Sequence, residues 1–149
     1  MRYFVVGGAG FIGSHLVDEL LKDKQNRVVV YDGFLSGKTS LLSHIRSKRL
    51  TIVKGLIHDK AKLKESMAGC DFVFHLAANP DIRRGIEETG LDLERNAETT
   101  LFVLRAMHEN GIDKIAFSSS GTIYGNIGSK TAVENNIQNL PISLYGASK

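Results

Sequence analysis

The sequence predicts an α/β fold, a doubly wound parallel sheet of five strands in the order 3-2-1-4-5 with helices on both faces. Three observations lead to this expectation. Short apolar runs typical of buried strands recur along the chain, longer segments with helical periodicity separate them, and no internal repeat or low-complexity tract interrupts the alternation. Because parallel strands are joined by right-handed crossovers, the helices must cover both sides of the sheet.

The elements follow one another in strict alternation. The first strand, RYFVV, precedes the amphipathic segment FIGSHLVDELLKD, and the long segment LDLERNAETTLFVLRAMHENG has a helical period that ends at Gly111. Strands are expected at 2–6, 27–32, 50–55, 71–78 and 114–120, long helices at 11–23 and 91–111, and short helices around 38–45 and 61–69.

Composition indicates one ordinary globular domain over residues 1–149. Hydrophobic residues make up 42% of the chain, charged residues 23%, and there are only two prolines. The formal charge is +3 with a pI near 9.0. However, the basic residues are scattered, and HIRSKRL at 44–50 has no interleaved aromatic residues, so it is interpreted as a solvated face. No nucleic-acid partner is expected.

The remaining compositional features exclude several classes of protein. A single cysteine, Cys70, allows no internal disulfide, supplies no metal-ligand spacing and is expected to be buried by packing. The start of the chain has no cleavage-like site, and no apolar stretch reaches membrane-spanning length. We therefore expect a cytoplasmic protein with neither a metal site nor a membrane partner.

A glycine-rich turn joins the first strand to the first helix. In VVGGAGFIGSHLV, Gly7, Gly10 and Gly13 permit a tight turn, close approach to a pyrophosphate and close packing of helix on strand. Asp32 ends the second strand, where a carboxylate accepts hydrogen bonds from an adenosine ribose. A tight turn followed by a solvated acid is the simpler alternative. The full context favours a Rossmann-like dinucleotide site, and Asp32 favours NAD over NADP. Lys38 in the following loop either softens that preference or, as is more common for such a residue, is simply solvated.

The chain ends with PISLYGASK, in which Tyr145 and Lys149 are four residues apart. On a helix this spacing places two side chains on one face. A core-facing tyrosine and a surface lysine are the ordinary explanations of such residues taken singly.

Together these motifs resemble the extended short-chain dehydrogenase/reductases, specifically the NAD-dependent nucleotide-sugar epimerases and dehydratases such as UDP-glucose 4-epimerases. The resemblance covers the whole chain, through GGAGFIGSH, YDGFLSGK, VFHLAANPDIRRG, FSSSGTIYG, TAVENN and PISLYGASK. It implies that the chain is the N-terminal, NAD-binding half of a longer enzyme whose substrate lobe follows residue 149.

The resemblance also implies a set of cofactor-binding residues. These are Gly7, Gly10, Phe11, Ile12, Gly13, Asp32, Leu56, Ile57, Leu76, Ala77, Ala78, Asn96, Ser118, Tyr145 and Lys149. One position departs from the family pattern, because Leu56 stands where many relatives have an aspartate that reaches adenine. We expect an apolar contact there, with Ile57 flanking the ring, at a cost of about 1 kcal/mol.

The catalytic residues that the resemblance implies are Ser120, Tyr145 and Lys149. Tyr145 as a phenolate takes the proton from the sugar C4 hydroxyl while hydride passes to NAD, which gives a 4-keto sugar that can be reduced on its other face. Tyrosine ionises near pH 10, so this role needs positive charge from Lys149 and the oxidised nicotinamide. The substrate would be a nucleotide sugar, a UDP-hexose.

Alternatives within and outside the family stay open. Dehydratases typically have Asp and Glu after the strand-five serine or threonine, whereas Gly121 and Thr122 stand here, so epimerisation is favoured over elimination. Decarboxylation is less well excluded, and a noncatalytic NAD-binding module belongs to a different class.

Homodimers of the family pair the helix near 91–110 with the catalytic helix. We expect that this helix cannot form at the end of the chain and that the 149 residues alone are inactive.

Overall fold

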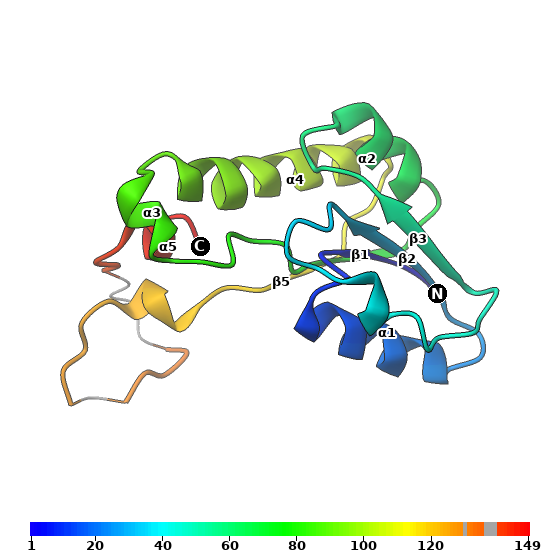
Figure 1. The fold of residues 1–149 in the computed structure, drawn as a ribbon, viewed down its shortest axis with the longest axis horizontal. Helices are drawn as coiled ribbons and strands as arrows, with labels where there is room; N and C mark the ends of the chain where they lie inside the picture. The colour runs from blue at the N-terminus through cyan, green and yellow to red at the C-terminus, as the bar shows by residue number, and fades with distance from the viewer. Residues whose placement is uncertain (130, 136–139) are drawn as a thin grey trace. The chain divides into compact units, whose positions relative to one another are not determined.

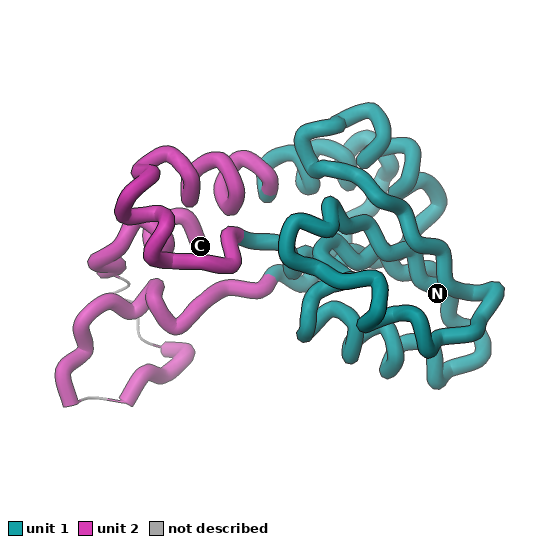
Figure 2. The backbone as a smooth tube through the Cα atoms, viewed as in Figure 1, with its two compact units in different colours: residues 1–78, 100–117 teal, residues 79–99, 118–149 magenta. Residues whose placement is uncertain are grey.

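The computed structural model describes residues 1–129, 131–135 and 140–149. The chain forms two compact units, which Figure 2 distinguishes by colour. Unit 1 contains residues 1–78 and 100–117, and unit 2 contains residues 79–99 and 118–149. Asn136 of the TAVENN motif lies outside the described residues.

Unit 1 is built on a parallel sheet. Its strands are β1 (Arg2–Val6), β2 (Arg27–Asp32), β3 (Leu50–Lys54), β4 (Phe72–His75) and β5 (Ile115–Phe117). Among the described residues these five strands pair in the order β3-β2-β1-β4-β5, all in parallel, which confirms the predicted fold (Figure 1). In this order β1 and β4 are neighbours although β2 and β3 lie between them in the chain, so the winding direction changes at β1.

Two apolar clusters hold helices against the two faces of this sheet. Phe4, Val6 and Tyr31 pack with α2 (Lys60–Met67) and α4 (Thr99–Glu109) on one face. Val5 and Val30 pack with α1 (Phe11–Lys22) on the other (Figure 1). Successive residues of a strand point to opposite faces, which explains why neighbours in β1 belong to different clusters.

Unit 2 consists mainly of short helical turns. They are α3 (Arg84–Glu87), the π-helix η2 (Leu93–Glu98), the 3-10 helix η3 (Gly121–Tyr124) and α5 (Leu144–Ala147). The η2 turn runs directly into α4, which ends before Gly111, a residue with a φ of 68°. Glycine tolerates this left-handed conformation, so the predicted end of the long helix is confirmed.

Several predicted elements differ in detail. The strands expected at 71–78 and 114–120 are shorter, because their last residues leave the sheet. The helix expected at 38–45 is only the 3-10 turn η1 (Thr39–Leu41), and α3 was not predicted. The expectation that no helix forms at the end of the chain is wrong: α5 makes one turn, because the Ser143 side chain caps it by accepting from the Gly146 amide.

The expectation of a solvated face at 44–50 is also wrong for one residue. The Arg49 guanidinium donates to the carbonyls of Leu21, Asp23 and Asn26 at 2.9, 2.7 and 2.9 Å. These carbonyls lie in the last turn of α1 and just beyond it, where a helix leaves acceptors without intrahelical partners. Arg49 therefore closes the C-terminal end of α1.

Cys70 is buried, as expected, and burial raises the pKa of its thiol to about 11. In the part of the chain that the structure describes, no group of metal-ligating side chains is gathered, and no helix has the length and apolar character needed to cross a membrane.

Replacing Arg49 by leucine should lower the free energy of unfolding by about 1–3 kcal/mol, because partly buried carbonyls at the end of α1 lose their donors. Urea unfolding followed by circular dichroism measures the change. Arg46 is exposed in the same segment. Its leucine variant is the matched control and should stay within about 0.5 kcal/mol of the wild type. Equal effects of the two substitutions would show that the guanidinium contacts contribute little.

Candidate functional site

The glycine turn of unit 1 brings three backbone segments into close contact. Gly7 has a φ of 82°, and a Cβ on it would lie 2.7 Å from the backbone nitrogen of Ala77. A Cβ on Gly13 would overlap the carbonyl oxygen of Gly7. The turn can therefore pass between β4 and the start of α1 only if both positions lack side chains.

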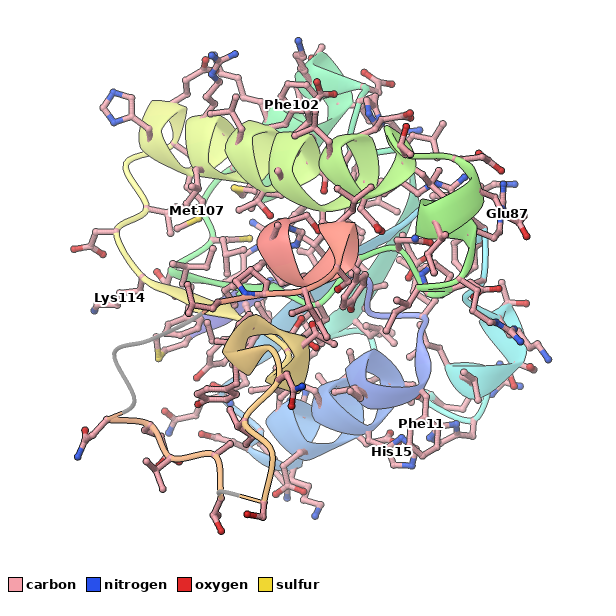
Figure 3. All side chains as sticks on the ribbon, turned by 90° about the vertical axis from the view of Figure 1, so that its left-hand side faces the viewer. Phe11, His15, Glu87, Phe102, Met107 and Lys114 are labelled. Carbon is pink, nitrogen blue, oxygen red and sulfur yellow. The ribbon has the colours of Figure 1, made fainter. Side chains whose placement is uncertain are left out.

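The N-terminus of α1 is open to a ligand. Gly10 is its N-cap and supplies no side-chain hydrogen bond, and no acidic residue occupies the first turn. Phe11 and Ile12 are 75% and 67% exposed, and the Phe11 ring packs against His15, with ring centroids 4.7 Å apart (Figure 3). Free amide donors and the positive end of the helix dipole favour an anion at such a terminus.

Asp32 joins the glycine turn to the loop after β2. Its Oδ2 accepts from the Ala9 amide at 2.9 Å and its Oδ1 from the Phe34 amide at 2.7 Å. Asp32 is 9% exposed. Each carboxylate oxygen can accept a second hydrogen bond, so these contacts leave acceptor capacity for a ribose. The carboxylate has a structural role that the sequence analysis did not assign to it.

Lys38 lies in the same loop, and its amide donates to the Ala9 carbonyl at 3.0 Å. Lys38 lines an open surface pocket together with Thr39, Ser40 and Lys54. This pocket therefore carries two lysine side chains in the part of unit 1 that follows β2 and β3.

The two residues after β3 have different environments. Leu56 is 50% exposed, and its carbonyl accepts from the Tyr31 hydroxyl at 2.9 Å. Ile57 packs against the apolar cluster that holds α2 and α4 on the sheet. Leu56 therefore offers an exposed apolar surface just after β3, whereas Ile57 packs partly into the core.

Leu76, Ala77 and Ala78 follow β4 at the same edge of the sheet. The amides of Leu76 and Ala77 both donate to the Val6 carbonyl, at 2.9 and 3.2 Å. This shared acceptor keeps the segment against the end of β1 after the regular ladder has finished. Small side chains suit a segment that the glycine turn approaches so closely.

Unit 2 contains Ser120, Tyr145 and Lys149, the residues that were predicted to be catalytic. Tyr145 lies within α5 and Lys149 just beyond it, and both are half-buried. Ser120 is the N-cap of η3, where its Oγ accepts from the Thr122 amide at 3.2 Å and from the Thr122 hydroxyl at 2.9 Å. Contacts between α5 and η3 bring these motifs to one part of unit 2. Ser118 is half-buried and precedes them in the chain.

Asn96 also belongs to unit 2 and is only 2% exposed. It lies in the η2 π-turn, accepts from the Asn79 amide at 2.7 Å and donates to the Ser148 hydroxyl at 2.8 Å. π-Turns within helices are often found at functional sites. The sequence pointed to Asn96, but it gave no sign of its partner Asn79 or of the neighbouring buried Asp92.

The surroundings of Tyr145 and Lys149 favour the uncharged forms of both side chains. Burial raises the pKa of the Tyr145 phenol, and the negative charge of Asp92 raises it further. Burial lowers the pKa of the Lys149 ammonium. A phenolate at Tyr145 therefore needs added positive charge, as the sequence analysis expected, and burial disfavours the charged form of Lys149 that was expected to supply part of it.

The strand order, the glycine turn and the open α1 terminus together define a dinucleotide-binding α/β protein. The model of the NAD-dependent epimerase/dehydratase family matches residues 3–149. The chain belongs to this family.

The comparisons include epimerases and a dehydratase. An uncharacterised UDP-glucose epimerase of Bacillus subtilis is 36% identical over 100% of this chain and 48% of that protein. The UDP-glucose 4-epimerase of Thermus thermophilus, solved with NAD, matches with a TM-score of 0.88 at 33% identity. The match covers 100% of this chain and 47% of the Thermus chain.

A dTDP-glucose 4,6-dehydratase from Streptomyces venezuelae, solved with NAD, matches with a TM-score of 0.92 at 33% identity. The match covers 100% of this chain and 48% of the dehydratase chain. The chain thus spans about half the length of the proteins that it matches. Because one fold carries both reactions, the comparisons establish the family without deciding between epimerisation and elimination.

Replacing Asp32 by asparagine should lower the free energy of unfolding by about 1–3 kcal/mol, because one of the two backbone donors would face an amide NH₂ group instead of an oxygen. Thermal unfolding measures the loss. Asp59, the N-cap of α2, accepts from the Lys62 amide at 3.1 Å and provides a control. Asparagine caps a helix as well as aspartate, so Asp59→Asn should change the stability by less than about 0.5 kcal/mol. An unchanged stability of Asp32→Asn would contradict the structural role of its carboxylate.

Proposed function

We propose that the chain is the NAD-binding half of a nucleotide-sugar epimerase that inverts C4 of a UDP-hexose, interconverting UDP-glucose and UDP-galactose. The observation that carries the proposal is the joint presence of the glycine turn with an open α1 terminus and of the Ser120, Tyr145 and Lys149 motif, in a member of the NAD-dependent epimerase/dehydratase family.

The residues of unit 1 fit NAD. The absence of Cβ atoms at Gly7 and Gly13 leaves a tight backbone cradle, and the uncapped first turn of α1 offers amides to a pyrophosphate. Asp32 would hold the adenosine ribose, and Leu56 would cover the adenine. Leu76, Ala77 and Ala78 would lie beside the cofactor. Bound NAD would supply a hydride acceptor and, after the ketone has formed, a hydride donor.

Each residue of the motif has a defined task in this proposal. Tyr145 accepts the C4 hydroxyl proton as that carbon is oxidised and returns the proton when the ketone is reduced on its other face. Ser120 hydrogen-bonds the sugar hydroxyl and the phenol. Lys149 holds the nicotinamide ribose and supplies positive charge that favours the phenolate.

The residues after β5 favour epimerisation over the alternatives. Gly121 offers no side chain and Thr122 donates its hydroxyl to Ser120, so neither provides the acid and base that elimination of water needs. Decarboxylation of a UDP-glucuronate is the second reaction to test. A noncatalytic NAD-binding module is the third candidate, and the neutral state favoured for Tyr145 is the observation consistent with it.

The proposal includes a homodimer and a cytoplasmic location. The support for a dimer is the outer side of α4, where Leu101 and Leu104 are 44% and 45% exposed. The support for the location is that the only cysteine is buried and needs no oxidising compartment.

The 149-residue chain should bind NAD more tightly than NADP, and Asp32→Ala should reduce that preference by about tenfold or more, as expected for loss of a charged acceptor to a ribose hydroxyl. Titration calorimetry with both dinucleotides measures the ratio. The ratio is the informative quantity, because loss of the two internal hydrogen bonds weakens both complexes alike.

Lys38→Ala is the matched control for this ratio. It should weaken NADP binding more than NAD binding, because a solvated ammonium assists a 2′-phosphate and not a hydroxyl. An equal loss of both dinucleotides in Asp32→Ala would contradict the assignment of Asp32 to the ribose.

The 149-residue chain should not convert UDP-galactose to UDP-glucose in the presence of NAD, whereas the native polypeptide that contains it should. Catalysis needs Tyr145 fixed to a fraction of an ångström relative to cofactor and sugar. Product formation is followed chromatographically. In the longer polypeptide Tyr145→Phe should reduce kcat by about 10²-fold or more, which is the usual contribution of a proton-transfer group.

The same assay separates the alternatives. Release of CO₂ from UDP-glucuronate, or formation of a 4-keto-6-deoxy sugar, would replace the epimerase proposal by a decarboxylase or a dehydratase. Comparable activity in the short chain would contradict the view that it is only half of the enzyme.

A further inference from the structure

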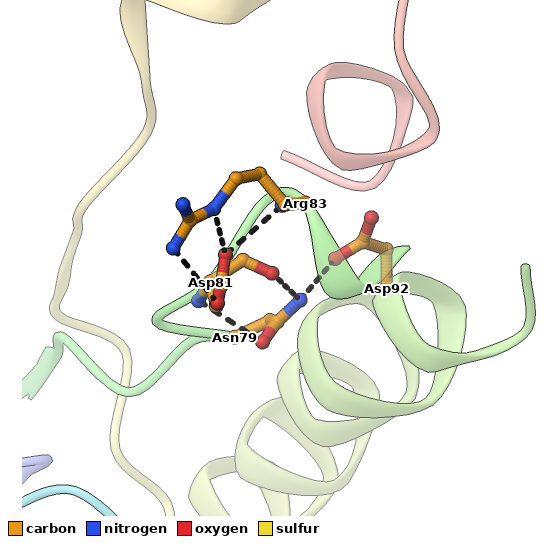
Figure 4. A network of polar contacts seen from close by, with 4 residues as sticks. All are labelled: Asn79, Asp81, Arg83 and Asp92. Carbon is orange, nitrogen blue, oxygen red and sulfur yellow. Dashed lines mark hydrogen bonds and ion pairs between the residues drawn. The ribbon is translucent and has the colours of Figure 1, made fainter. Parts of the chain in front are cut away.

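Asp92 is a buried carboxylate that the proposed chemistry does not use. It is 1% exposed and immediately precedes the η2 π-turn of unit 2. Its Oδ1 accepts from the Asn79 side-chain amide at 2.8 Å (Figure 4). Among the described residues no donor reaches its Oδ2. A buried oxygen without a partner is unfavourable, so the position of Asp92 requires an explanation.

Asn79 is held in one orientation by this contact and by its own turn. Its Nδ2 also donates to the Asp81 carbonyl at 2.9 Å, and its Oδ1 accepts from the Asp81 amide at 3.3 Å. A carbonyl oxygen can only accept and a backbone N–H can only donate, so the side-chain amide cannot be reversed without losing both bonds.

The backbone of Asn79 in turn orients Asn96. The Asn79 N–H donates to Asn96 Oδ1 at 2.7 Å, which directs Asn96 Nδ2 toward its other partner, the Ser148 hydroxyl, at 2.8 Å. Ser148 passes the contact on by donating to the Tyr145 carbonyl at 2.8 Å. A continuous series of hydrogen bonds therefore runs from Asp92 to the backbone of Tyr145, entirely within unit 2.

Packing around Asp92 preserves this series. Gly85 of α3 lies so close that a Cβ on it would overlap Asp92 Oδ2. The same short helix contacts α5. The backbone of Gly85 therefore packs closely against the Asp92 carboxylate, and a side chain at position 85 would displace it.

We propose that Asp92 is a positioning residue, which fixes the Tyr145 turn through Asn79, Asn96 and Ser148. The proposal rests on the proposed function only in giving Tyr145 a catalytic role. In the absence of the Asp92 acceptor, the Asn79 side chain keeps only its local turn contacts, and the orientation of Asn96 toward Ser148 loses its support.

The charge of Asp92 is a cost to the proposed chemistry. It adds to the effect of burial in raising the pKa of Tyr145, which disfavours the phenolate. In this proposal Asp92 therefore acts through its hydrogen bond to Asn79 and not through electrostatic assistance to the phenolate. The other titratable groups near α5 are Lys149, just beyond it, and those of the elements packed against it, namely Arg84, Glu87, Glu94, Arg95, Glu98 and Tyr124.

Three variants separate the hydrogen bond from the charge. Asp92→Leu removes both, Asp92→Asn keeps an acceptor for Asn79 and removes the charge, and Ser148→Ala breaks the series at its far end without changing any charge. Glu88→Gln is the control, because Glu88 forms an exposed ion pair with Arg84 in the same unit. The readouts on the 149-residue chain are amide hydrogen exchange and the pH titration of ¹³C-labelled Tyr145 by NMR.

In Asp92→Leu and Ser148→Ala, hydrogen exchange of the Ala147 and Lys149 amides should be about tenfold faster. Losing one hydrogen bond of ordinary net strength changes an opening equilibrium by about this factor. Asp92→Asn should restore most of this protection and should lower the pKa of Tyr145. Ser148→Ala should leave that pKa nearly unchanged, and Glu88→Gln should change neither readout.

Unchanged exchange in a folded Asp92→Leu protein would overturn the proposal, and so would equally faster exchange in the strands of unit 1, which indicates general destabilisation. If Asp92→Leu does not fold, Ser148→Ala together with Asp92→Asn decides. Faster exchange in Ser148→Ala with most of the protection kept in Asp92→Asn supports the series, and any other pattern contradicts it. Neither readout uses turnover, so failure of the proposed epimerase activity is detected separately.

Discussion

Unit 1 depends on the close approach of backbone segments at the carboxyl end of β1. Gly7 lies against the Ala77 nitrogen, and the first turn of α1 lies against the Gly7 carbonyl. A side chain at Gly7 would force the segment after β4 away from the sheet, and a side chain at Gly13 would force α1 away. The same approach leaves the amides of the α1 terminus free at the edge where β1 and β4 end. The packing constraint and the terminus proposed to bind the pyrophosphate are therefore one feature of the backbone.

The two units are stabilised by different interactions. In unit 1, apolar residues from the strands fill both faces of the sheet against helices. In unit 2 the buried side chains include Asn79, Asp92, Asn96 and Thr99, which are joined by directional contacts. Apolar packing tolerates small rearrangements, whereas directional hydrogen bonds between buried polar groups specify one geometry. Under the proposed function, such contacts suit a segment that holds Tyr145 in place.

The pKa changes within unit 2 bear on when Tyr145 can act. Burial and Asp92 favour the neutral phenol, and burial disfavours the Lys149 ammonium. Under the proposed function, the base then depends on positive charge that comes with the oxidised cofactor. Proton removal would thus be favoured when a hydride acceptor is present, which would limit unproductive chemistry.

The sequence by itself determined the sheet, its strand order and the glycine turn. Apolar period and glycine spacing are local properties, and crossover handedness leaves few ways to connect the strands they predict. Tertiary structure alone decided that Arg49 caps α1, that Asp32 links two loops, and that α5 forms a turn supported by Asn96 and Ser148. The partners in these contacts are 28, 23 and 52 residues apart in the chain. Their meeting follows from the path of the backbone in three dimensions, which no local pattern of residue types encodes.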